Sequence, residues 1–336
     1  MNRINYPDRV KLASMPTPIV RLNHWSRELG VDLYVKHDDR TGSDLSGNKV
    51  RKLEFHFAEA QARGCDVVVT CGGVQSNHAR ATAIAARQLG LDAVLILRSR
   101  TTPPGGEPVD GNLFLDRLVG ARVVWVTPDE YRSREAVYER LDAELRLAGR
   151  TPYLMPEGGS DEVGAWGYIA AVEEIAAQES EMGVRFDAIV HAVGSGGTTA
   201  GLVLGTKLAG VGAEVRGFAV CDDTAYFVSR VMSIVERTVD RYQLRIPFSS
   251  NELRIDDRYK GVGYALSRPE EISLIKSAAR TDGIILDPVY TGKAFFGMVD
   301  LIRADRLSFG RRVLFVHTGG IFGLLAATSD VVPSLA

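Results

Sequence analysis

Two lysines and an arginine crowd the start of an expected helix in the segment SGNKVRKLEF, residues 46–55. Lys49, Arg51 and Lys52 all fall in the first turn, where the helix macrodipole stabilises anions rather than cations. A lysine amine becomes a nucleophile when burial or a neighbouring cation keeps it neutral. The segment is therefore the first candidate for a reactive site.

A glycine-rich turn, AVGSGGTTAG at residues 192–201, follows an expected strand and opens an expected helix. Glycines let the backbone approach a ligand closely, and the N–H groups at the start of a helix point at an anion. Ser195, Thr198 and Thr199 add hydroxyl donors to the same turn. This combination favours a phosphate group as the ligand.

The same turn has two other interpretations that the residues alone leave open. Gly194 and Gly196 match the first two glycines of the dinucleotide fingerprint G-x-G-x-x-G, but Thr199 stands in the third position. An acidic pair, Asp222 and Asp223, ends the next expected strand, as that fingerprint requires. Against it, the first strand of a fold normally carries the motif, and this turn lies past the middle of the chain. A plain tight turn without a ligand is the third interpretation.

Polar residues also gather at two further turns. The segment TCGGVQSNHAR places Ser76, Asn77 and His78 at the N-terminus of an expected helix, where serine and asparagine are ordinary caps. One cap is enough, however, and four polar side chains in a row, beginning with Gln75, exceed that need. The segment HTGG, residues 317–320, also ends an expected strand, and a lone histidine there is more often structural than catalytic.

Short β-rich segments alternate with longer amphipathic ones along the chain, and residues 101–112 form an expected surface loop. The expected strands cover residues 31–36, 66–70, 93–97, 121–126, 188–192, 215–220 and 313–317. The expected helices cover residues 48–63, 77–89, 132–148, 199–209, 224–242 and 270–281, with another that runs through residue 175. Such alternation predicts an α/β fold with mostly parallel sheets, because parallel strands need crossovers and helices supply them. Ligands in these sheets bind beyond the carboxyl ends of the strands, where the candidate turns lie.

Composition and charge argue against several classes of protein. The 336 residues are 45% hydrophobic and 24% charged, which is ordinary for a globular chain and suggests roughly two domains. A net charge of -2 without a long basic run argues against nucleic acid as a partner. The N-terminal segment lacks the apolar stretch of a signal peptide, and no apolar run reaches the length of a membrane span. Three cysteines without CxxC spacing fit a reducing compartment. We therefore expect a cytoplasmic protein without a membrane partner, and no metal site is predicted.

Five of these segments occur in an order that resembles one known family. GNKVRKLEF, GGVQSNHAR, GSGGTTAG, LDPVYTGK and HTGG are similar, in this order, to motifs of the pyridoxal-phosphate enzymes of fold type II. More narrowly, they look like the branch that contains D-cysteine desulfhydrase and 1-aminocyclopropane-1-carboxylate deaminase, from about residue 16 to residue 317. The resemblance implies pyridoxal 5'-phosphate as the cofactor, in a cleft between two three-layer αβα domains, and a homodimer. The large cofactor-binding domain would comprise residues 1–50 and 156–336, and the small substrate-side domain residues 51–155.

The resemblance also implies how single residues contact the cofactor. Lys49 would form a Schiff base with the cofactor aldehyde, and Lys52, three residues on and on the same helix face, would meet the cofactor phosphate. Asn77 would hydrogen-bond the ring hydroxyl oxygen, and Thr291 would face the ring nitrogen. The phosphate would be held by the glycine-rich turn, through Gly194, Ser195, Gly196, Gly197 and Thr198.

On the substrate side, the resemblance implies that Ser76 and the main-chain N–H groups of Asn77 and His78 receive the carboxylate of an amino acid. Ser76 is further implied in proton movement near the reacting carbon. Tyr264, in GVGYAL, and Tyr290, in DPVYTGK, match positions that line the substrate side of the cofactor. A lone tyrosine is more often a half-buried core residue, so the motif context alone favours a site role.

Three positions favour the desulfhydrase pattern over the deaminase pattern. Deaminases typically carry glutamate, leucine and glutamine where this chain has Thr291, the substrate-side Thr318 and His78. A glutamate would keep the ring nitrogen protonated and make the ring a stronger electron sink, which opening a cyclopropane needs more than releasing a thiolate. Two departures from the family pattern would reshape the pocket: Ser46 replaces a glycine, and residues 321–322 after HTGG are isoleucine and phenylalanine.

Together these patterns predict a lyase that performs α,β-elimination on a small amino acid, with D-cysteine giving pyruvate, sulfide and ammonia. Lys49 is the predicted base that removes the α-proton, with Ser76 or one of the tyrosines, Tyr264 or Tyr290, assisting in catalysis. Four alternatives stay open: ring opening of the cyclopropane amino acid, sulfo-lyase action on L-cysteate, a nicotinamide oxidoreductase built on residues 194–197, and a relative that binds amino acids without catalysis.

Overall fold

Two β-sheets organise the fold, which the computed structural model describes for residues 5–261, 263 and 265–331. The larger sheet has six strands in the order β1-β2-β10-β7-β8-β9. Its neighbouring strands run parallel, except for the antiparallel pair β1 and β2. These strands are β1 (Ile19–Arg21), β2 (Asp32–Lys36), β7 (Ala188–Val193), β8 (Glu214–Ala219), β9 (Arg254–Asp256) and β10 (Arg312–Val316).

The smaller sheet has four strands in the order β5-β4-β3-β6, and all of its pairs are parallel. These strands are β3 (Val67–Gly73), β4 (Asp92–Arg98), β5 (Arg122–Val126) and β6 (Pro152–Leu154). Strands β3 and β4 are buried along nearly their whole length, as expected of parallel strands that are covered on both faces. The predicted α/β fold with mostly parallel sheets is confirmed.

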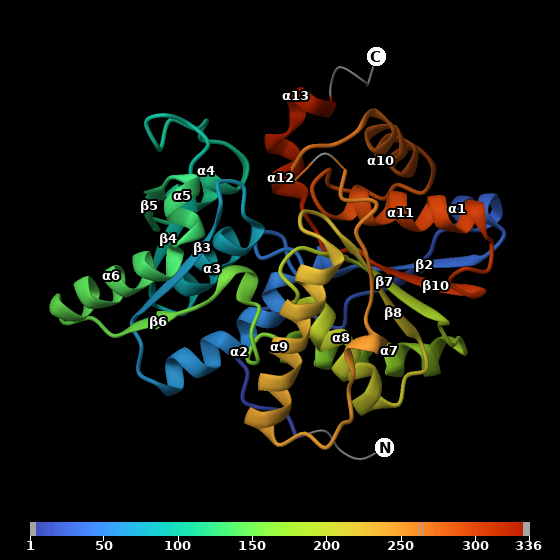
Figure 1. The fold of residues 1–336 in the computed structure, drawn as a ribbon, viewed down its shortest axis with the longest axis horizontal. Coiled ribbons are helices and arrows are strands. Elements are labelled where there is room, and N and C mark those ends of the chain that lie inside the picture. The colour runs from blue at the N-terminus through green and yellow to red at the C-terminus, as the bar shows by residue number, and fades with distance from the viewer. Residues whose placement is uncertain (1–4, 262, 264, 332–336) are drawn as a thin grey trace.

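Helices surround both sheets, and the smaller sheet with its helices lies on the left in Figure 1. The helices are α1 (Asn23–Leu29), α2 (Lys49–Ala62), α3 (Asn77–Gln88), α4 (Gly111–Leu118), α5 (Pro128–Arg132), α6 (Arg134–Leu147), α7 (Trp166–Met182), α8 (Gly197–Ala209), α9 (Thr224–Tyr242), α10 (Pro269–Thr281), α11 (Thr291–Ala304), α12 (Ile321–Ala326) and α13 (Thr328–Val331). Three short 3₁₀ helices are η1 (Asp38–Arg40), η2 (Glu157–Gly159) and η3 (Ser250–Glu252). In the described part of the chain, no helix has the length and apolar character needed to cross a membrane.

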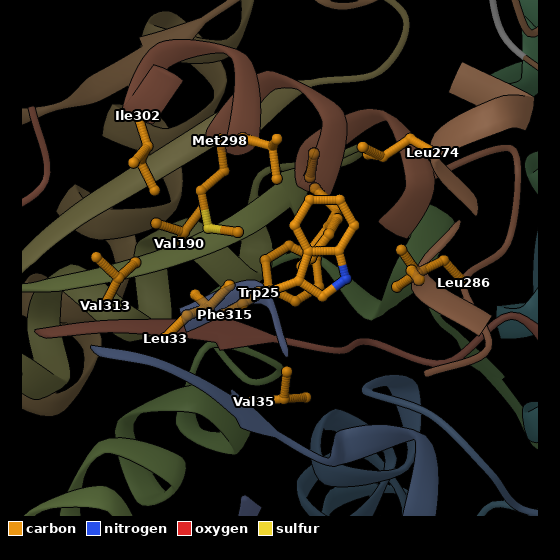
Figure 2. Close-up of a cluster of buried hydrophobic side chains, with 14 of the residues drawn as sticks. Trp25, Leu33, Val35, Val190, Leu274, Leu286, Met298, Ile302, Val313 and Phe315 are labelled. Atoms are coloured by element: carbon orange, nitrogen blue, oxygen red, sulfur yellow. The ribbon is translucent and has the colours of Figure 1, made fainter. Parts of the chain in front are cut away.

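The larger sheet is held between two hydrophobic clusters, one on each face. On one face, α1, α10 and α11 contribute to the cluster in Figure 2, where Trp25 and Met298 join Leu33 of β2 and Phe315 of β10. Trp25 also meets Phe295 edge to face, with ring centroids 5.3 Å apart. Helices α7, α8 and α9 build the cluster on the other face. This arrangement gives the sheet a helical layer on each side.

Helix α2 is buried on every side for about two turns. Every residue from 50 to 57 is buried. The helix packs against α7 of the larger sheet and against α3 of the smaller sheet. Val50 and Leu53 belong to the hydrophobic cluster of the smaller sheet, whereas Phe55 belongs to that of the larger sheet. A helix that is buried all round belongs to the interior of a protein, so α2 connects the two sheets.

Most predicted elements agree with the structure, and α9 has the predicted bounds 224–242. Helix α11 was not predicted, because Gly292 and Gly297 lower the helix propensity of its sequence. Both glycines are needed for close packing. A Cβ at Gly292 would lie 2.6 Å from Ile275 Cδ1, and one at Gly297 would lie 2.5 Å from the Phe218 ring. Tertiary packing therefore overrides propensity in this helix.

The predicted domain boundaries stay a prediction. All strands of the smaller sheet lie within the predicted small domain, residues 51–155. Ala13 and Leu45, however, belong to the hydrophobic cluster of the smaller sheet, although the sequence assigned residues 1–50 to the large domain. The N-terminal segment thus contributes to the core of both sheets.

Candidate active site

A cavity of about 660 Å³ opens at the carboxyl ends of parallel strands from both sheets. Gly73 and Arg98 reach it from β3 and β4, while Val193 and Cys221 reach it from the ends of β7 and β8. Ligands of open α/β sheets bind at this position. The predicted site residues that line the cavity are Lys49, Ser76, Asn77, His78, Gly194, Ser195, Gly196, Thr198, Tyr290 and Thr318.

Three other predicted site residues that the structure describes do not line it: Lys52, Gly197 and Thr291. Lys52 and Gly197 lie just behind the wall, since a Cβ at Gly197 would be 2.9 Å from Lys52 Nζ. Thr291 is buried at the start of α11, and its hydroxyl donates to Asp287 Oδ1 at 2.7 Å. The structure therefore gives Thr291 a contact inside its own helix start and none with the cavity. Tyr264 lies outside the described residues.

The three cations at the start of α2 have separate environments. Arg51 is 1% exposed and donates to both carboxylate oxygens of Asp38, at 2.8 and 2.9 Å, and to Glu174 at 3.0 Å. Lys52 Nζ donates to Ser160 Oγ at 3.1 Å and to the Gly158 main-chain oxygen at 3.3 Å. Lys49 has no hydrogen bond or ion pair with any described residue. Of these three cations, Lys49 alone lines the cavity, and it alone lacks a hydrogen-bond or ion-pair partner among the described residues.

Burial lowers the pKa of both lysines. The pKa of Lys49 falls to about 8 because burial penalises its charged form, and the carboxylate of Glu157 opposes the shift only in part. Burial also holds the pKa of Lys52 well below its usual value, and the neighbouring Lys49 lowers it further. The protonated forms of two amines are unfavourable in one buried region. A nearby anion would stabilise these forms and raise the pKa of both amines.

The start of α8 provides a place for that anion. Gly196 adopts a left-handed φ of 86° before the helix, which leaves the first N–H groups of α8 without carbonyl partners. A Cβ at Gly197 would lie 2.6 Å from Ser160 Oγ, so only glycine leaves this space open. Thr199 Oγ1 is buried and has no hydrogen-bond partner, while Thr198 Oγ1 accepts from Asn48 Nδ2 at 3.2 Å. These features fit a phosphate group.

The start of α3 faces the same cavity with polar groups. Ser76 is the N-cap, and its Oγ accepts from the Ala79 N–H at 3.1 Å. His78 Nε2 lies 2.8 Å from Thr70 Oγ1, whose hydroxyl donates to the Met155 main-chain oxygen. Burial and then Lys49 hold the pKa of His78 well below its ordinary value. His78 is therefore neutral, with Nε2 protonated and Nδ1 left as a buried acceptor without a partner.

His317, in the segment HTGG, has a structural role. Its Nε2 donates to the Ile285 main-chain oxygen at 2.9 Å, and its Nδ1 accepts from the Gly319 N–H at 3.2 Å. The turn packs against the segment before Lys49, because the Thr318 main-chain oxygen accepts from the Asn48 N–H at 3.0 Å. The turn thereby supports the start of α2.

Sequence reasoning missed charged and aromatic residues that line the cavity from both the smaller-sheet and the larger-sheet side. The guanidinium groups of Arg98 and Arg134 each lie 5.2 Å from the centroid of the Tyr131 ring. Arg134 also approaches Glu157 at 3.8 Å. The missed residues that line the cavity include Arg98, Tyr131, Arg132, Arg134, Glu157, Asp222, Tyr226 and Arg230. The rule that ligands bind beyond strand ends could have found Arg98 and Asp222, which end or follow predicted strands.

Comparison with known proteins identifies the family. A family model described as pyridoxal-phosphate dependent enzyme matches residues 10–319. The chain belongs to this family. A curated relative from Arabidopsis thaliana, named bifunctional D-cysteine desulfhydrase/1-aminocyclopropane-1-carboxylate deaminase, mitochondrial, is 44% identical over 319 residues, which cover 93% of this chain and 78% of the relative. The predicted resemblance to the D-cysteine desulfhydrase and 1-aminocyclopropane-1-carboxylate deaminase family is confirmed.

Solved structures agree with the family and with the fold. The crystal structure of an ACC deaminase homologue matches with a TM-score of 0.87 and 38% identity, covering 98% of this chain and 96% of the other. A fungal L-serine ammonia-lyase from Rhizomucor miehei matches with a TM-score of 0.68 at 18% identity, covering 95% of this chain and 98% of the other, and this likeness shows the fold alone. The pyridoxal-phosphate enzymes of fold type II are thus the structural neighbours of this chain.

The cofactor of this family is pyridoxal phosphate, and the cavity fits it. The cofactor carries an aldehyde, which requires a neutral amine, and a phosphate, which requires an anion site. Lys49, whose lowered pKa makes the neutral form more accessible, would offer the first, and the open start of α8 with its unpartnered Thr199 hydroxyl would offer the second. The family assignment also removes the support for a dinucleotide site at residues 194–197.

The pKa of Lys49 predicts how attachment of the cofactor depends on pH. Only the neutral amine attacks an aldehyde, and its fraction at a pKa of about 8 rises roughly tenfold from pH 7 to pH 9 and then levels off. We therefore expect the rate at which cofactor-free protein combines with pyridoxal phosphate to rise in the same way, measured by stopped-flow absorbance. A simple alkylamine with an ordinary lysine pKa, the control, should gain roughly a hundredfold over this interval. A hundredfold gain for the protein as well would show that Lys49 is not shifted.

Proposed function

We propose that the protein performs α,β-elimination on a small amino acid and that D-cysteine, which gives pyruvate, sulfide and ammonia, is its preferred substrate. One observation carries this proposal: the buried amine of Lys49, whose pKa is lowered, and the N-terminus of α3 open into the same cavity. An amine that can accept a proton and a helix start that can hold a carboxylate are the two groups that elimination from an amino acid requires.

In this proposal, the start of α8 and Lys52 would hold the phosphate, Lys49 would hold the aldehyde carbon, and Asn77 would contact the ring oxygen. The bound cofactor supplies an electron sink for the negative charge that develops at the α-carbon. Tyr290 packs against the glycine-rich turn, since a Cβ at Gly194 would lie 2.8 Å from its ring. Any side chain at residue 194 would therefore displace Tyr290 from the cavity wall.

The substrate carboxylate is placed at the main-chain N–H groups of Asn77 and His78, because the first turn of α3 leaves them without carbonyl partners. Lys49, once free of the aldehyde, is the base for the α-proton. Ser76 accepts a hydrogen bond from Ala79 through its Oγ, so its own hydroxyl hydrogen is available to assist. A neutral His78 adds no positive charge that would compete with Lys49 for the carboxylate.

The surroundings of Thr291 support elimination over ring opening. The hydroxyl of Thr291 is engaged by Asp287, and that carboxylate in turn accepts the N–H groups of Val289, Tyr290 and Thr291. The carboxylates that line the cavity are Glu157 and Asp222, within the described residues. A ring nitrogen that faced Thr291 would have no carboxylate partner there, and this suits the release of a good leaving group better than the opening of a cyclopropane.

Ring opening of 1-aminocyclopropane-1-carboxylate is the second candidate, because the Arabidopsis thaliana relative is named for both activities. L-cysteate is a third substrate to consider, since four arginines line the cavity and would favour an anionic side chain: Arg98, Arg132, Arg134 and Arg230. A homodimer and a cytoplasmic location belong to the same proposal.

A substrate panel tests the proposal. We expect the purified protein with pyridoxal phosphate to release sulfide and pyruvate from D-cysteine with a kcat/KM at least about tenfold above that for L-cysteine, L-cysteate or 1-aminocyclopropane-1-carboxylate, a difference of about 1.4 kcal/mol in the transition state. L-cysteine is the matched control, because it differs only in handedness. Faster release of 2-oxobutyrate from the cyclopropane substrate would reject the preference for D-cysteine. No turnover of any member would reject the proposed activity.

A further inference from the structure

A buried chain of polar side chains connects α3 to the start of α4 beside the candidate site. Asn112, near the start of α4, is 0% exposed. Its Oδ1 accepts from Arg80 Nε at 3.1 Å, and its Nδ2 donates to the Gln75 main-chain oxygen at 3.1 Å and to Asn77 Oδ1 at 3.2 Å. Asn77 lines the cavity, whereas Arg80 and Asn112 lie behind it.

The donors and acceptors among these hydrogen-bonded side chains fix the orientation of the Asn112 and Asn77 amides. Arg80 Nε can only donate, so the Asn112 atom that faces it has to be the oxygen. Asn112 then directs its NH₂ group at the Gln75 carbonyl, which can only accept, and at the side chain of Asn77. Asn77 must therefore offer its oxygen to Asn112. Its own NH₂ group lies on the other side of the amide, and no described residue accepts a hydrogen bond from it.

Arg80 is itself held firmly in place. It is 1% exposed and donates to the Ser46 main-chain oxygen at 3.0 Å and to the Asp44 main-chain oxygen. Its guanidinium carbon lies 4.8 Å from the centre of the Phe322 ring. Ser46 and Phe322 are departures from the family pattern that the sequence could not place, and both contact this one arginine. Arg80 therefore links the segment before Lys49 to the hydrogen bonds that run through Asn112 to Asn77.

Gln75 closes the same network from the side of α4. Its Oε1 accepts from the Asn112 N–H at 2.8 Å, and its Nε2 donates to Asp110 Oδ1 at 2.8 Å. Gly111 fits between them with a left-handed φ of 49°, and a Cβ there would lie 2.6 Å from Gln75 Oε1. The expected surface loop of residues 101–112 thus ends in a tightly packed contact with the start of α3.

We propose that Arg80 and Asn112 are positioning residues that fix the side-chain amide of Asn77, so that its NH₂ group faces the cavity as a hydrogen-bond donor. A donor at this place favours an acceptor that carries negative charge. The ring oxygen of pyridoxal phosphate is such an acceptor in its phenolate form. The inference rests on the proposed function in one respect, the placement of the cofactor ring beside Asn77.

The variant Asn112→Asp tests this orientation. A carboxylate can only accept, so Asn77 would turn its NH₂ group toward residue 112 and its oxygen toward the cavity. We expect the dissociation constant for pyridoxal phosphate to rise roughly ten- to hundredfold, as for the loss of one hydrogen bond to a charged group. The constant for 3-deoxypyridoxal phosphate, which lacks the ring hydroxyl, should change less than about threefold. Both constants are measured by fluorescence titration of the cofactor-free protein.

The two cofactor forms separate positioning from a merely structural role. An equal rise for both, or no rise for either, would overturn the role of Asn112. Asn251→Asp is the matched control, because it makes the same chemical change at an exposed residue, and neither dissociation constant should change.

If thermal melting shows that Asn112→Asp does not fold, Asn112→Ala replaces it, and an unchanged preference for the form with the hydroxyl overturns the inference. Asn77→Ala should abolish that preference. If it does not, the placement of the ring at Asn77 fails, and the inference fails with it.

Discussion

Replacing Lys49 by alanine is expected to abolish covalent attachment of pyridoxal phosphate and to lower kcat by about 10³-fold or more. The expected loss is large because one amine is proposed both as the attachment point and as the base for the α-proton, and a positioned base alone contributes about 10²- to 10⁴-fold. Lys49 is also the cavity-lining lysine whose amine has no hydrogen bond among the described residues. Borohydride reduction followed by peptide mapping measures attachment, and pyruvate release measures kcat.

Two further lysines serve as controls for this experiment. Lys52→Ala should weaken binding of the cofactor while leaving attachment at residue 49 detectable, because Lys52 Nζ lies behind the start of α8 and not in the cavity wall. Lys11→Ala removes an exposed amine and should change nothing. Reduced cofactor found on any peptide other than the one containing Lys49 would place the attachment site elsewhere and contradict the proposed chemistry.

Replacing Arg51 by methionine is expected to lower the free energy of unfolding by about 3–5 kcal/mol. Arg51 is buried with two carboxylates, Asp38 at 0% exposure and the partly buried Glu174. Removing the guanidinium leaves Asp38 as a buried charge with two hydrogen-bond donors, Tyr168 at 2.6 Å and Thr17 at 2.9 Å, and with Lys36 as the remaining nearby cation. Urea unfolding of the cofactor-free protein, followed by circular dichroism, measures the change.

Arg146→Met is the matched control for the stability experiment. It makes the same substitution in α6, where Arg146 pairs with Asp142 at 2.8 Å but is 57% exposed. An exposed ion pair is screened by solvent, so the control should cost little. Adding Asp38→Asn to Arg51→Met should recover part of the loss, because it removes the uncompensated charge. A loss for Arg51→Met no greater than that for Arg146→Met would mean that the buried network contributes nothing to stability.

Local sequence patterns were sufficient to predict the fold class and the part of the cavity that depends on strand ends. Lys49, Ser76, Asn77 and the glycine-rich turn around Gly196 lie within a few residues of predicted strand or helix starts, and all line the cavity. Their positions follow from the rule that ligands bind beyond the carboxyl ends of parallel strands. Short-range patterns carry this information because each element positions its own first or last residues.

Contacts between distant segments could not be predicted from the sequence. The pair Arg80 and Asn112 is separated by 32 residues, and the pair Arg51 and Glu174 by 123 residues, with no local pattern to connect either one. The hydrogen bond of Thr291 could not be predicted either. Its family position suggested a contact with the ring nitrogen, whereas its hydroxyl donates to Asp287, just before the same helix. Such choices depend on which buried donors and acceptors meet after packing, and this is a property of the whole fold.

The burial of α2 on every side has a consequence for how the protein can change through mutation. Residues 50–57 include no exposed position, so each side chain there already fills a site against α7, α3 or the buried charge network. An ordinary amphipathic helix tolerates substitution on its outer face, but this segment has no outer face to vary. A change that improves the fit to one sheet disturbs the fit to the other. New substrate preferences should therefore arise by substitution in the loops around the cavity, while the helix that carries the reactive lysine stays nearly constant.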